Sequence, residues 1–581
     1  MSKPNRHAKA GLFNTIITFE KERALDFGTG ITFKQIQDQD PTEFDIVVDI
    51  RVRCDSLSVS FTYRVSRLPV ELVRVIGRTF STVVEDIVAK LDASVSEVKV
   101  LSVMDYRQVL DWNSPPTNAV NLCLHNVIRM RCLELPDRSA IHAWDGSLTY
   151  QEVWDRSSRL ANRLISLGVG IEMPVPICLE KSVWVPICML AVLRAGGVCV
   201  LINSGTHIER IRAVLQEVTS SIILVSPRKT RFEFQEPLKK VIISPEIFIG
   251  SIPNQVSTPT VQPKNAAFIL FTSGSTGRSK GIILQHKNPC TDWQDIKNKL
   301  MVSCESRVLH FASYTFDASV NEILSSLTTG ACICIPSETA RMNELEAFIT
   351  HAQINWTLIT PSLFRRFQPN NVLILRVVVL TGEPMPQDLV DLWEDRVILS
   401  NAYGPAECTI CTIHQIEPGK WSAGTVGKPV GGSGWIVDPS NVNRPMPIGA
   451  VGELLFAGPV VARGYFQLPG ATEAAFISPP SWVPAEFPEA NGRLYRTGDM
   501  VHYNLDGSLR YLGRKDNQVK IRGQRVELEE VELHIRRLLP FGYDMVVDHI
   551  RLAERPTALL VAFIHRRVET REDENARPLF I

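Results

Sequence analysis

Two stretches near the start of the chain alternate apolar and polar residues. Residues 46–52 carry isoleucine or valine at every second position, and residues 57–65 repeat the pattern with leucine, valine, phenylalanine and tyrosine. A period of two predicts two adjacent strands, each with one buried face, joined by a turn at Cys54-Asp55-Ser56. Apolar residues from Leu72 to Leu91 then recur at spacings of three and four, which predicts a helix. The segment up to residue 110 is therefore a small α+β unit or the tail of a larger one.

Between residues 121 and 506, helical periods alternate with short apolar runs. The helix that starts at Tyr150 keeps apolar residues on one face and is expected to stop at Gly168. Repeated strand–helix alternation predicts a large α/β domain with mostly parallel sheets. The paired prolines Pro115 and Pro116 break both kinds of element and place a linker before this domain. The runs expected to form strands include 222–225, 266–271, 377–380 and 453–456.

The chain after Gly513 predicts a smaller α+β piece. Residues 520–523 are strand-like, a helical spacing of apolar residues runs from Val531 to Leu539, and residues 557–564 form another apolar run. The mostly charged stretch 566–577 is expected to be a solvated, frayed end.

Composition excludes several classes of protein. The 581 residues include 62 Lys and Arg and 62 Asp and Glu, 45% are hydrophobic and 21% charged, so neither disorder nor a coiled coil is indicated. Zero net charge gives no reason to expect a nucleic-acid partner or a membrane surface. The apolar run 183–193 is interrupted by Arg194 and is too short to span a bilayer. The polar, basic start of the chain lacks the hydrophobic stretch of a signal peptide, so a cytoplasmic location is expected.

The 12 cysteines are scattered, as is usual for reduced thiols. The Cys408-x-x-Cys411 pair has no second pair to complete a zinc site and does not open a helix. Packing is therefore the preferred interpretation of this pair.

A loop suited to phosphate follows the apolar run 266–271. It reads Thr272-Ser273-Gly274-Ser275-Thr276-Gly277-Arg278-Ser279-Lys280-Gly281. Glycines let backbone N–H groups converge on an anion, hydroxyls add donors, and a lysine supplies charge. It is not a Walker motif, because no Gly-Lys-Ser/Thr triplet closes it.

This loop resembles the signature of the enzymes that form acyl and aminoacyl adenylates, and most closely the adenylation domains of nonribosomal peptide synthetases. Leu201, Asn203 and Ser204 follow shortly after the second of the segments named in the next sentence, and they depart from the family's usual Pro, Asp and Pro. The resembling segments occur in the family's order: Leu148-Thr149-Tyr150-Gln151-Glu152, Leu193-Arg194-Ala195-Gly196-Gly197, Phe316-Asp317-Ala318-Ser319, Asn401-Ala402-Tyr403-Gly404-Pro405-Ala406-Glu407, Gly452-Glu453-Leu454, Val461-Ala462-Arg463-Gly464-Tyr465, Tyr495-Arg496-Thr497-Gly498-Asp499 and Gly513-Arg514-Lys515-Asp516 with the residues up to Gly523.

The resemblance implies binding of ATP and Mg²⁺. Thr272, Ser273, Gly274, Ser275, Thr276, Gly277 and Lys280 would hold the β- and γ-phosphates. Asn401 and Tyr403 would meet the adenine, Asp499 and Arg514 the ribose hydroxyls, and Glu407 the metal. Asp516 resembles the hinge between the two subdomains of the family.

The resemblance also implies an α-amino acid as the second substrate, because Asp317 occupies the position that pairs with the α-ammonium group. The other pocket positions would be Ala318, Asn321, Leu358, Val379, Thr381, Ala402, Ile410 and Cys411. Besides Asp317, this wall has only Asn321 and Thr381 as polar groups, so an uncharged, aromatic or branched aliphatic side chain is expected. A purely structural role in the core is the alternative for the apolar positions, and above all for Leu358 and Val379.

Some parts of the family pattern have no match. The catalytic lysine of the family's C-terminal loop has no matching residue before Ile581, so weak or absent adenylation is one expectation. No His-His-x-x-x-Asp-Gly condensation motif and no Gly-Gly-x-Ser carrier motif occurs, so this chain has no phosphopantetheine site and would need a carrier domain or other modules in trans.

The predicted organisation has four parts. They are a C-terminal fragment of a condensation domain at 1–110, based on Gly11-Leu12-Phe13-Asn14-Thr15 and the strands that follow, a linker at 111–120, the adenylation core at 121–514 and a truncated C-terminal subdomain at 515–581. Two alternatives to an amino-acid-activating enzyme remain, namely a remnant of a larger synthetase that binds without turnover and an acyl- or aryl-CoA ligase.

Overall fold

The computed structural model describes most of the chain as two compact units. It describes residues 14–21, 44–52, 57–114, 117–229, 238–248, 257, 259–272, 280–485, 487, 492–516, 518–521, 524–536, 538–539, 543–550, 559–566 and 579–580. Unit 1 comprises residues up to Trp112 together with 444–450 and 503–506, and unit 2 comprises the rest. The boundaries predicted at 120 and 514 stay predictions. A frayed end is predicted at 566–577, but Arg566 closes a strand that starts at Leu559, because it pairs with Tyr543 across the sheet; residues 567–577 lie outside the described residues.

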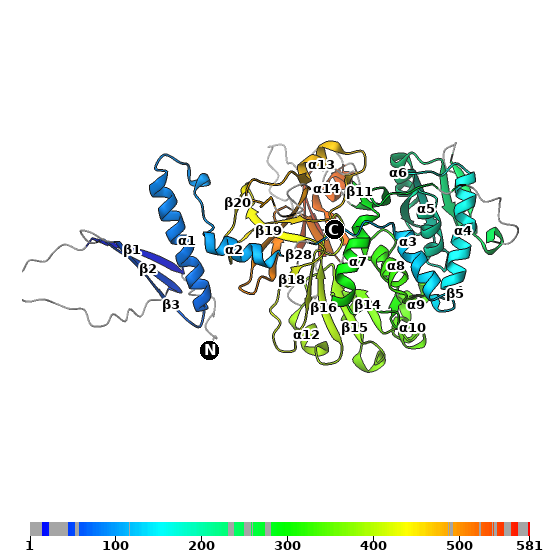
Figure 1. The fold of residues 1–581 in the computed structure, drawn as a ribbon, viewed down its shortest axis with the longest axis horizontal. Helices are drawn as coiled ribbons and strands as arrows, with labels where there is room; N and C mark the ends of the chain where they lie inside the picture. Colours follow the sequence, from blue (N-terminus) through cyan, green and yellow to red (C-terminus); the bar gives the residue numbers. More distant parts are fainter. Residues whose placement is uncertain are drawn as a thin grey trace, which may run out of the picture. The chain divides into compact units, whose positions relative to one another are not determined.

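Unit 1 is built on a three-stranded sheet and a long helix (Figure 1). The alternating segments form β2 (Ile46–Val52) and β3 (Leu57–Tyr63), which pair antiparallel as predicted, while β1 (Thr15–Lys21) pairs parallel with β2. Phe80 of α1 (Val70–Ala89) meets Phe61 of β3 edge to face, with ring centroids 6.0 Å apart. Helix α2 (Val103–Trp112) continues two residues into the predicted linker, and its first turn is closed by the Ser102 hydroxyl, which accepts from the Asp105 N–H.

Unit 2 contains a seven-stranded sheet in the order β22-β11-β10-β7-β6-β8-β9. Its centre is parallel, because β6, β7, β8, β9 and β10 are connected through helices or long segments, and only the edge formed by β11 and β22 is antiparallel. The strands are β6 (Pro174–Leu179), β7 (Val198–Asn203), β8 (Ile222–Val225), β9 (Lys239–Ile242), β10 (Ala266–Thr272), β11 (Lys280–Gln285) and β22 (Gly464–Tyr465).

The second, larger sheet of unit 2 changes character along its length. From β4 to β16 it is parallel except for the β4–β5 hairpin, as the strand–helix alternation predicts. Beyond β16 the observed pairings are antiparallel. The change begins at β16 and β17, whose short connection cannot cross over the sheet. The prediction of mostly parallel strands is therefore correct for this larger sheet only in the half from β4 to β16. The strands are β4 (Ser139–Ala143), β5 (Gly146–Thr149), β12 (Arg307–Leu309), β13 (Cys332–Ile335), β14 (Trp356–Ile359), β15 (Val377–Thr381), β16 (Ile398–Tyr403), β17 (Thr412–Gln415), β18 (Thr425–Pro429), β19 (Ser433–Asp438), β20 (Asn441–Pro445), β21 (Gly452–Ala457), β23 (Phe476–Ile477), β24 (Leu494–Tyr503) and β25 (Leu509–Arg514).

Helices flank these sheets (Figure 1). Helices such as α4 and α6 bury an apolar face. Helix α4 starts with a capping box, in which the Thr149 hydroxyl accepts from the Glu152 N–H and the Glu152 carboxylate accepts from the Thr149 N–H, and it ends just before Gly168. The apolar run 183–193 forms α5, every residue of which from Val185 to Leu193 is buried against the sheet and α4. The helices of unit 2 are α3 (Leu124–Glu134), α4 (Tyr150–Ser166), α5 (Trp184–Arg194), α6 (Ile208–Val218), α7 (Lys287–Lys299), α8 (Asp317–Thr329), α9 (Glu338–Asn343), α10 (Leu345–His351), α11 (Pro361–Phe364), α12 (Gln387–Trp393), α13 (Pro469–Ala475) and α14 (Leu528–Arg536).

The predicted C-terminal elements are found close to their expected positions. They are two small sheets and α14, whose Val531 and Ile535 pack on the buried Met545 and Val547. The strands are β26 (Gln518–Ile521), β27 (Gln524–Glu527), β28 (Tyr543–Ile550), β29 (Leu559–Arg566) and β30 (Leu579–Phe580). Within the part of the chain that the structure describes, no helix is both long and apolar enough to cross a bilayer.

Candidate nucleotide and amino-acid site

The phosphate-loop candidate connects two paired strands. Thr272 ends β10 and Lys280 begins β11, and the two residues face each other across the antiparallel pair. The Thr272 hydroxyl donates to the Lys280 carbonyl at 3.4 Å. Ser273, Gly274, Ser275, Thr276 and Gly277 lie outside the described residues, so the structure fixes where their loop starts and ends.

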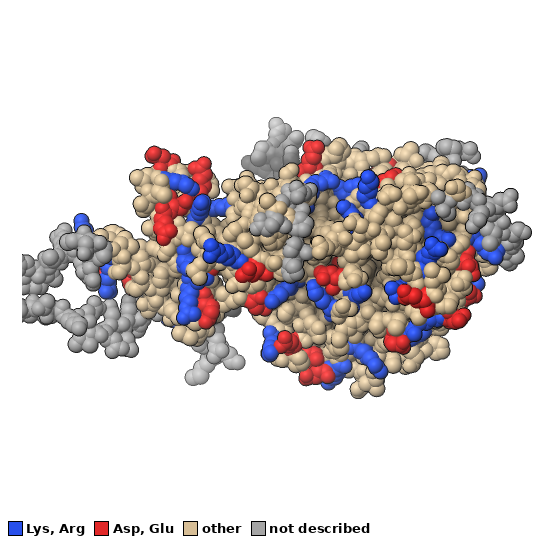
Figure 2. Space-filling model, viewed as in Figure 1, with Lys and Arg blue, Asp and Glu red and all other residues tan. Residues whose placement is uncertain are grey.

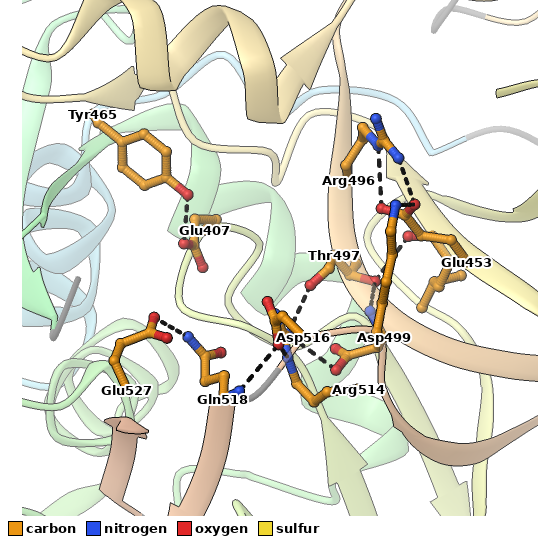
Figure 3. Close-up of polar contacts among 12 residues, drawn as sticks. Glu407, Glu453, Tyr465, Arg496, Thr497, Asp499, Arg514, Asp516, Gln518 and Glu527 are labelled. Carbon is orange, nitrogen blue, oxygen red and sulfur yellow. Dashed lines mark hydrogen bonds and ion pairs between the residues drawn. The ribbon is translucent and has the colours of Figure 1, made fainter. Parts of the chain in front are cut away.

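Tyr465 links this loop to the predicted metal ligand. The Lys280 ammonium lies 5.6 Å from the centroid of the Tyr465 ring, within cation–π distance. The Tyr465 hydroxyl donates to Glu407 Oε1 at 2.8 Å, and both side chains are buried (Figure 3). Tyr465 belongs to a resembling segment, but sequence reasoning assigned no role to it, because the bond joins residues 58 positions apart.

Glu407 fits a magnesium ion that is held mainly by phosphate oxygens and water. Magnesium commonly takes one or two protein carboxylates, and Glu407 is a buried carboxylate near the loop of Lys280. Among the described residues, no group of three or more His, Cys, Asp or Glu side chains could form an all-protein metal cage. Cys408 and Cys411 are both buried, and burial raises the pKa of each thiol, in keeping with packing.

Asp499 is the centre of the predicted ribose group (Figure 3). One of its carboxylate oxygens accepts from the Tyr403 hydroxyl, and the other accepts from Arg514 Nη1 at 3.1 Å. Asp499 is only 5% exposed, and these two donors provide the hydrogen bonds that a buried carboxylate needs. Burial and the neighbouring Asp499 carboxylate raise the pKa of Tyr403 well above its usual value, which keeps the phenol protonated as a donor.

The glycine in Thr497-Gly498-Asp499 is required by the backbone. Gly498 has φ +70°, and a Cβ at this position would lie 2.7 Å from Arg514 Nη2. The segment is part of β24 rather than a simple surface turn, so its aspartate is directed into the interior beside Arg514.

Arg514 connects the ribose group to the predicted hinge. Its Nε and Nη2 donate to the two oxygens of Asp516 at 2.7 and 2.6 Å, and Nη1 also donates to the Thr497 carbonyl at 2.8 Å. Although burial disfavours the charge, the bonds to Asp516 and Asp499 raise the pKa of Arg514 above its ordinary value. Asp516 also accepts from the Gln518 N–H at 3.3 Å, so the arginine ties the start of the C-terminal piece to the core.

A second ion pair that the sequence did not predict supports the same region. Arg496 donates to both oxygens of Glu453, the shorter contact being 2.6 Å, and Glu453 is 2% exposed. Lys515 reaches the same carboxylate at 3.3 Å. These residues brace β21 against β24 beside Asp499 (Figure 3).

The two adenine candidates come from β16. Asn401 is 6% exposed, and its side-chain amide donates to the Thr425 carbonyl of β18 at 2.9 Å. Tyr403 ends the strand, and its ring centroid lies 6.0 Å from that of Tyr511. Strand β16 therefore positions both candidates, although part of the hydrogen-bonding capacity of Asn401 is used by the backbone.

The amino-acid pocket candidates lie on three parallel strands, one helix and one connection. Leu358 is paired with Val379, and Thr381 with Ala402, across the strands β14, β15 and β16. The residues on α8 are Asp317, Ala318 and Asn321, and those on the β16–β17 connection are Ile410 and Cys411. Asp317, Ala318 and Thr381 are partly exposed, whereas the other apolar positions, Leu358 and Val379 among them, are buried. The alternative of a core role therefore stays open for these apolar positions.

Asp292 of α7 is a buried acid that the sequence did not indicate. Its Oδ2 accepts from the Thr409 hydroxyl at 2.8 Å, next to the pocket candidate Ile410. Among the described residues, Oδ1 has no hydrogen-bond partner. Burial above all, together with Asp295 and Asp317, raises the pKa of Asp292 to about 8.

Asp292→Asn is expected to flatten the pH dependence of stability. Because the acid binds its proton more tightly in the folded state than in the unfolded one, the free energy of unfolding falls as pH rises from about 4 to about 8. The amide removes this contribution, so the variant should gain stability relative to wild type across that window, on the order of a few kcal/mol. Urea unfolding at pH 5 and pH 8 measures the change, with Asp391→Asn on the exposed side of α12 as control. Equal shifts for Asp292→Asn at the two pH values would contradict the prediction.

Comparison with known proteins defines the class. The AMP-binding enzyme pattern matches residues 128–466, which is more than half of the 581 residues, so the chain belongs to the AMP-binding enzyme family. It is 35% identical over 562 residues to the nonribosomal peptide synthetase atnA of Emericella nidulans, covering 94% of this chain and 8% of that protein. It is 40% identical over 518 residues to the nonribosomal peptide synthetase ftmPS of Neosartorya fischeri, covering 87% of this chain and 23% of that protein. The chain thus spans less than a quarter of the length of these relatives.

Solved structures agree with the α/β fold. The nonribosomal peptide synthetase FmoA3 (S1046A) in its AMPPNP-bound form is 21% identical, with a TM-score of 0.72 and coverage of 87% of this chain and 55% of that one. The four-domain synthetase holo-AB3403, bound to AMP and glycine, is 23% identical, with a TM-score of 0.70 and coverage of 90% and 39%. The predicted α/β fold class is confirmed.

Proposed function

We propose that this chain is the adenylating part of a nonribosomal peptide synthetase. It activates an uncharged α-amino acid with ATP, giving aminoacyl-AMP and pyrophosphate, and the activated acid passes to a carrier domain. Membership of the AMP-binding enzyme family and 35–40% identity to synthetases support the reaction class. A carrier partner is supported by the solved adenylation–PCP structures that the chain resembles, such as NpsA-ThdA from Klebsiella oxytoca. A cytoplasmic location belongs to the same proposal.

The observation that carries the proposal is the arrangement around Asp499. A buried carboxylate beside a phenol and an arginine is suited to two vicinal hydroxyls. Lys280 lies over the Tyr465 ring, and Glu407 accepts from the Tyr465 hydroxyl. This arrangement would place the ribose at Asp499 and the phosphates near Lys280 and Glu407. Asp317 stands at the N-terminus of α8, where it can meet an ammonium group.

The reaction requires the amino-acid carboxylate to approach a polyanion. One carboxylate oxygen forms a bond to the α-phosphorus as the bond between that phosphorus and the oxygen bridging to the β-phosphate breaks. Lys280 and the loop before it would neutralise the leaving pyrophosphate, and Asp499, Arg514 and Tyr403 would hold the nucleoside in line. Magnesium, held by Glu407, would supply further positive charge at the phosphates.

Amino-acid-dependent exchange of pyrophosphate into ATP tests this function. The full chain is assayed with each amino acid and Mg·ATP, beside thermal unfolding with the same ligands. Exchange with one or a few uncharged amino acids supports the proposal. Ligand-induced stabilisation without exchange would favour a non-catalytic remnant, and thioester formation with free CoA would favour an acyl-CoA ligase.

For unit 1 we propose the C-terminal end of a condensation domain. The similarity to atnA covers 94% of this chain and therefore extends into unit 1. The β1–β2–β3 sheet with α1 is compatible with such an end, and the sequence carries no condensation motif of its own.

Tyr465→Phe is expected to weaken the use of magnesium without breaking the fold. The change removes one hydroxyl, and with it the 2.8 Å bond that orients Glu407. A hydrogen bond to a charged group is worth roughly 1.5–3 kcal/mol, so the concentration of magnesium for half-maximal exchange should rise by about tenfold to a hundredfold. Magnesium titrations measure the change, and Tyr543→Phe on the surface of β28 is the control. An unchanged magnesium requirement would show that the phenol does not position Glu407.

A further inference from the structure

The segment that leads into Asp317 is held by a buried lysine. Residues 310–316 connect β12 to α8, and Asp317 is the first residue of that helix. The Lys181 ammonium donates to the carbonyl of Ala312 at 2.6 Å and to that of His310 at 3.3 Å. It also lies 5.0 Å from the centroid of the Tyr314 ring. One side chain from the segment after β6 therefore contacts three residues of the connection.

Glu322 holds the same connection from the helix side. Its Oε2 contacts His310 Nδ1 at 2.6 Å, and both side chains are 0% exposed. The Ala312 N–H donates to the two carboxylate oxygens, each at 3.2 Å. The Ala312 residue is consequently fixed twice, through its carbonyl by Lys181 and through its N–H by Glu322.

Helix α8 joins this arrangement to the substrate candidates. Asp317 and Asn321 are four residues apart and share one side of the helix, whereas Glu322 is five residues from Asp317 and is rotated by roughly 140°. Glu322 can thus bond the connection while Asp317 faces elsewhere. A rotation or slide of α8 that displaced Asp317 would break the contacts of Glu322 to His310 and Ala312.

We propose that Lys181 and Glu322 are positioning residues that set the place of Asp317, and thereby control recognition of the substrate's α-ammonium group. This inference rests on the proposed function. Buried charges are costly, and apolar replacements often serve stability equally well. Here the Lys181 amine and the Glu322 carboxyl both bond the backbone of one connection, so together they fix the position at which α8 begins.

A double-mutant cycle with a substrate pair tests the proposal. Lys181→Met keeps the length of the side chain and removes its three donors, and it is made alone and together with Asp317→Asn. Each form is assayed by pyrophosphate exchange with the preferred amino acid and with the carboxylic acid that has the same side chain but no α-amino group. Lys181→Met should lower kcat/KM for the amino acid by about tenfold to a hundredfold and change kcat/KM for the des-amino acid much less. In the Asp317→Asn background it should have little further effect.

Controls separate this result from a general loss of structure. Lys420→Met changes a lysine whose side chain is 75% exposed and should leave both substrates unaffected. Glu322→Gln, which keeps the shape of the side chain, is the second variant if Lys181→Met does not fold, and it should show the same selective loss. Equal losses for both substrates, or additive losses with Asp317→Asn, would overturn the proposal. Absence of exchange in the wild-type chain would instead reject the proposed function.

Discussion

Asp317→Asn should reduce amino-acid-dependent pyrophosphate exchange by about a hundredfold to several thousandfold in kcat/KM. In the proposed complex the α-ammonium group leaves water and pairs with the Asp317 carboxylate at the start of α8. Removing one partner of a desolvated ion pair typically costs about 3–5 kcal/mol, because the remaining charge stays buried without compensation. The amide is close in size to the carboxylate, so the loss reports the charge rather than the volume.

The des-amino acid provides the matched comparison for this variant. Its weak activity should be unchanged or raised by Asp317→Asn, because no ammonium group needs a partner. Thermal unfolding of the variant should remain within about 1 kcal/mol of wild type, since Asp317 is partly exposed in the absence of substrate. If exchange with the amino acid survives at wild-type rates, Asp317 is not the ammonium ligand and the substrate class must be revised.

Asp499→Asn should raise the KM for ATP by about a hundredfold or more and also lower stability. The carboxylate accepts from Tyr403 and Arg514, and its own exposure is 5%. Neutralising it leaves a buried guanidinium with one fewer counter-charge, a change that commonly costs about 3–5 kcal/mol. Asp516 still pairs with Arg514, so the folded state should persist while the ribose contacts weaken.

An exposed ion pair is the control for Asp499→Asn. Asp388 pairs with Arg365 at 2.8 Å, and its side chain is 64% exposed, so Asp388→Asn should cost less than about 1 kcal/mol and leave the KM for ATP unchanged. Titrations of ATP at saturating amino acid, with thermal unfolding of the same samples, measure both effects. A similar KM for ATP in wild type and Asp499→Asn would remove the ribose assignment.

Periodicity in the sequence predicted many of the elements. The alternating segments became β2 and β3, the apolar runs at 222–225 and 377–380 lie in β8 and β15, and the helix from Tyr150 begins at that residue. Each of these signals is local, since one buried face or a capping box depends on residues within a few positions. Helix α2 continues through Asp111 and Trp112, the first two residues of the predicted linker, because Pro115 disfavours helix only from the residue before it onward.

Motifs that resemble the family also named Asp317, Glu407, Asp499 and Arg514 as site candidates, and the strand–helix alternation predicted an α/β fold. The three-dimensional structure was needed to show which of these groups lie in contact. It brings Tyr403 to Asp499 across 96 positions and Tyr465 to Glu407 across 58, and it leaves one oxygen of Asp292 in the interior without a partner among the described residues. Such contacts follow from the order and direction of strands in a sheet. That order is set by packing between distant segments, and the local periodicity of the sequence does not reveal it.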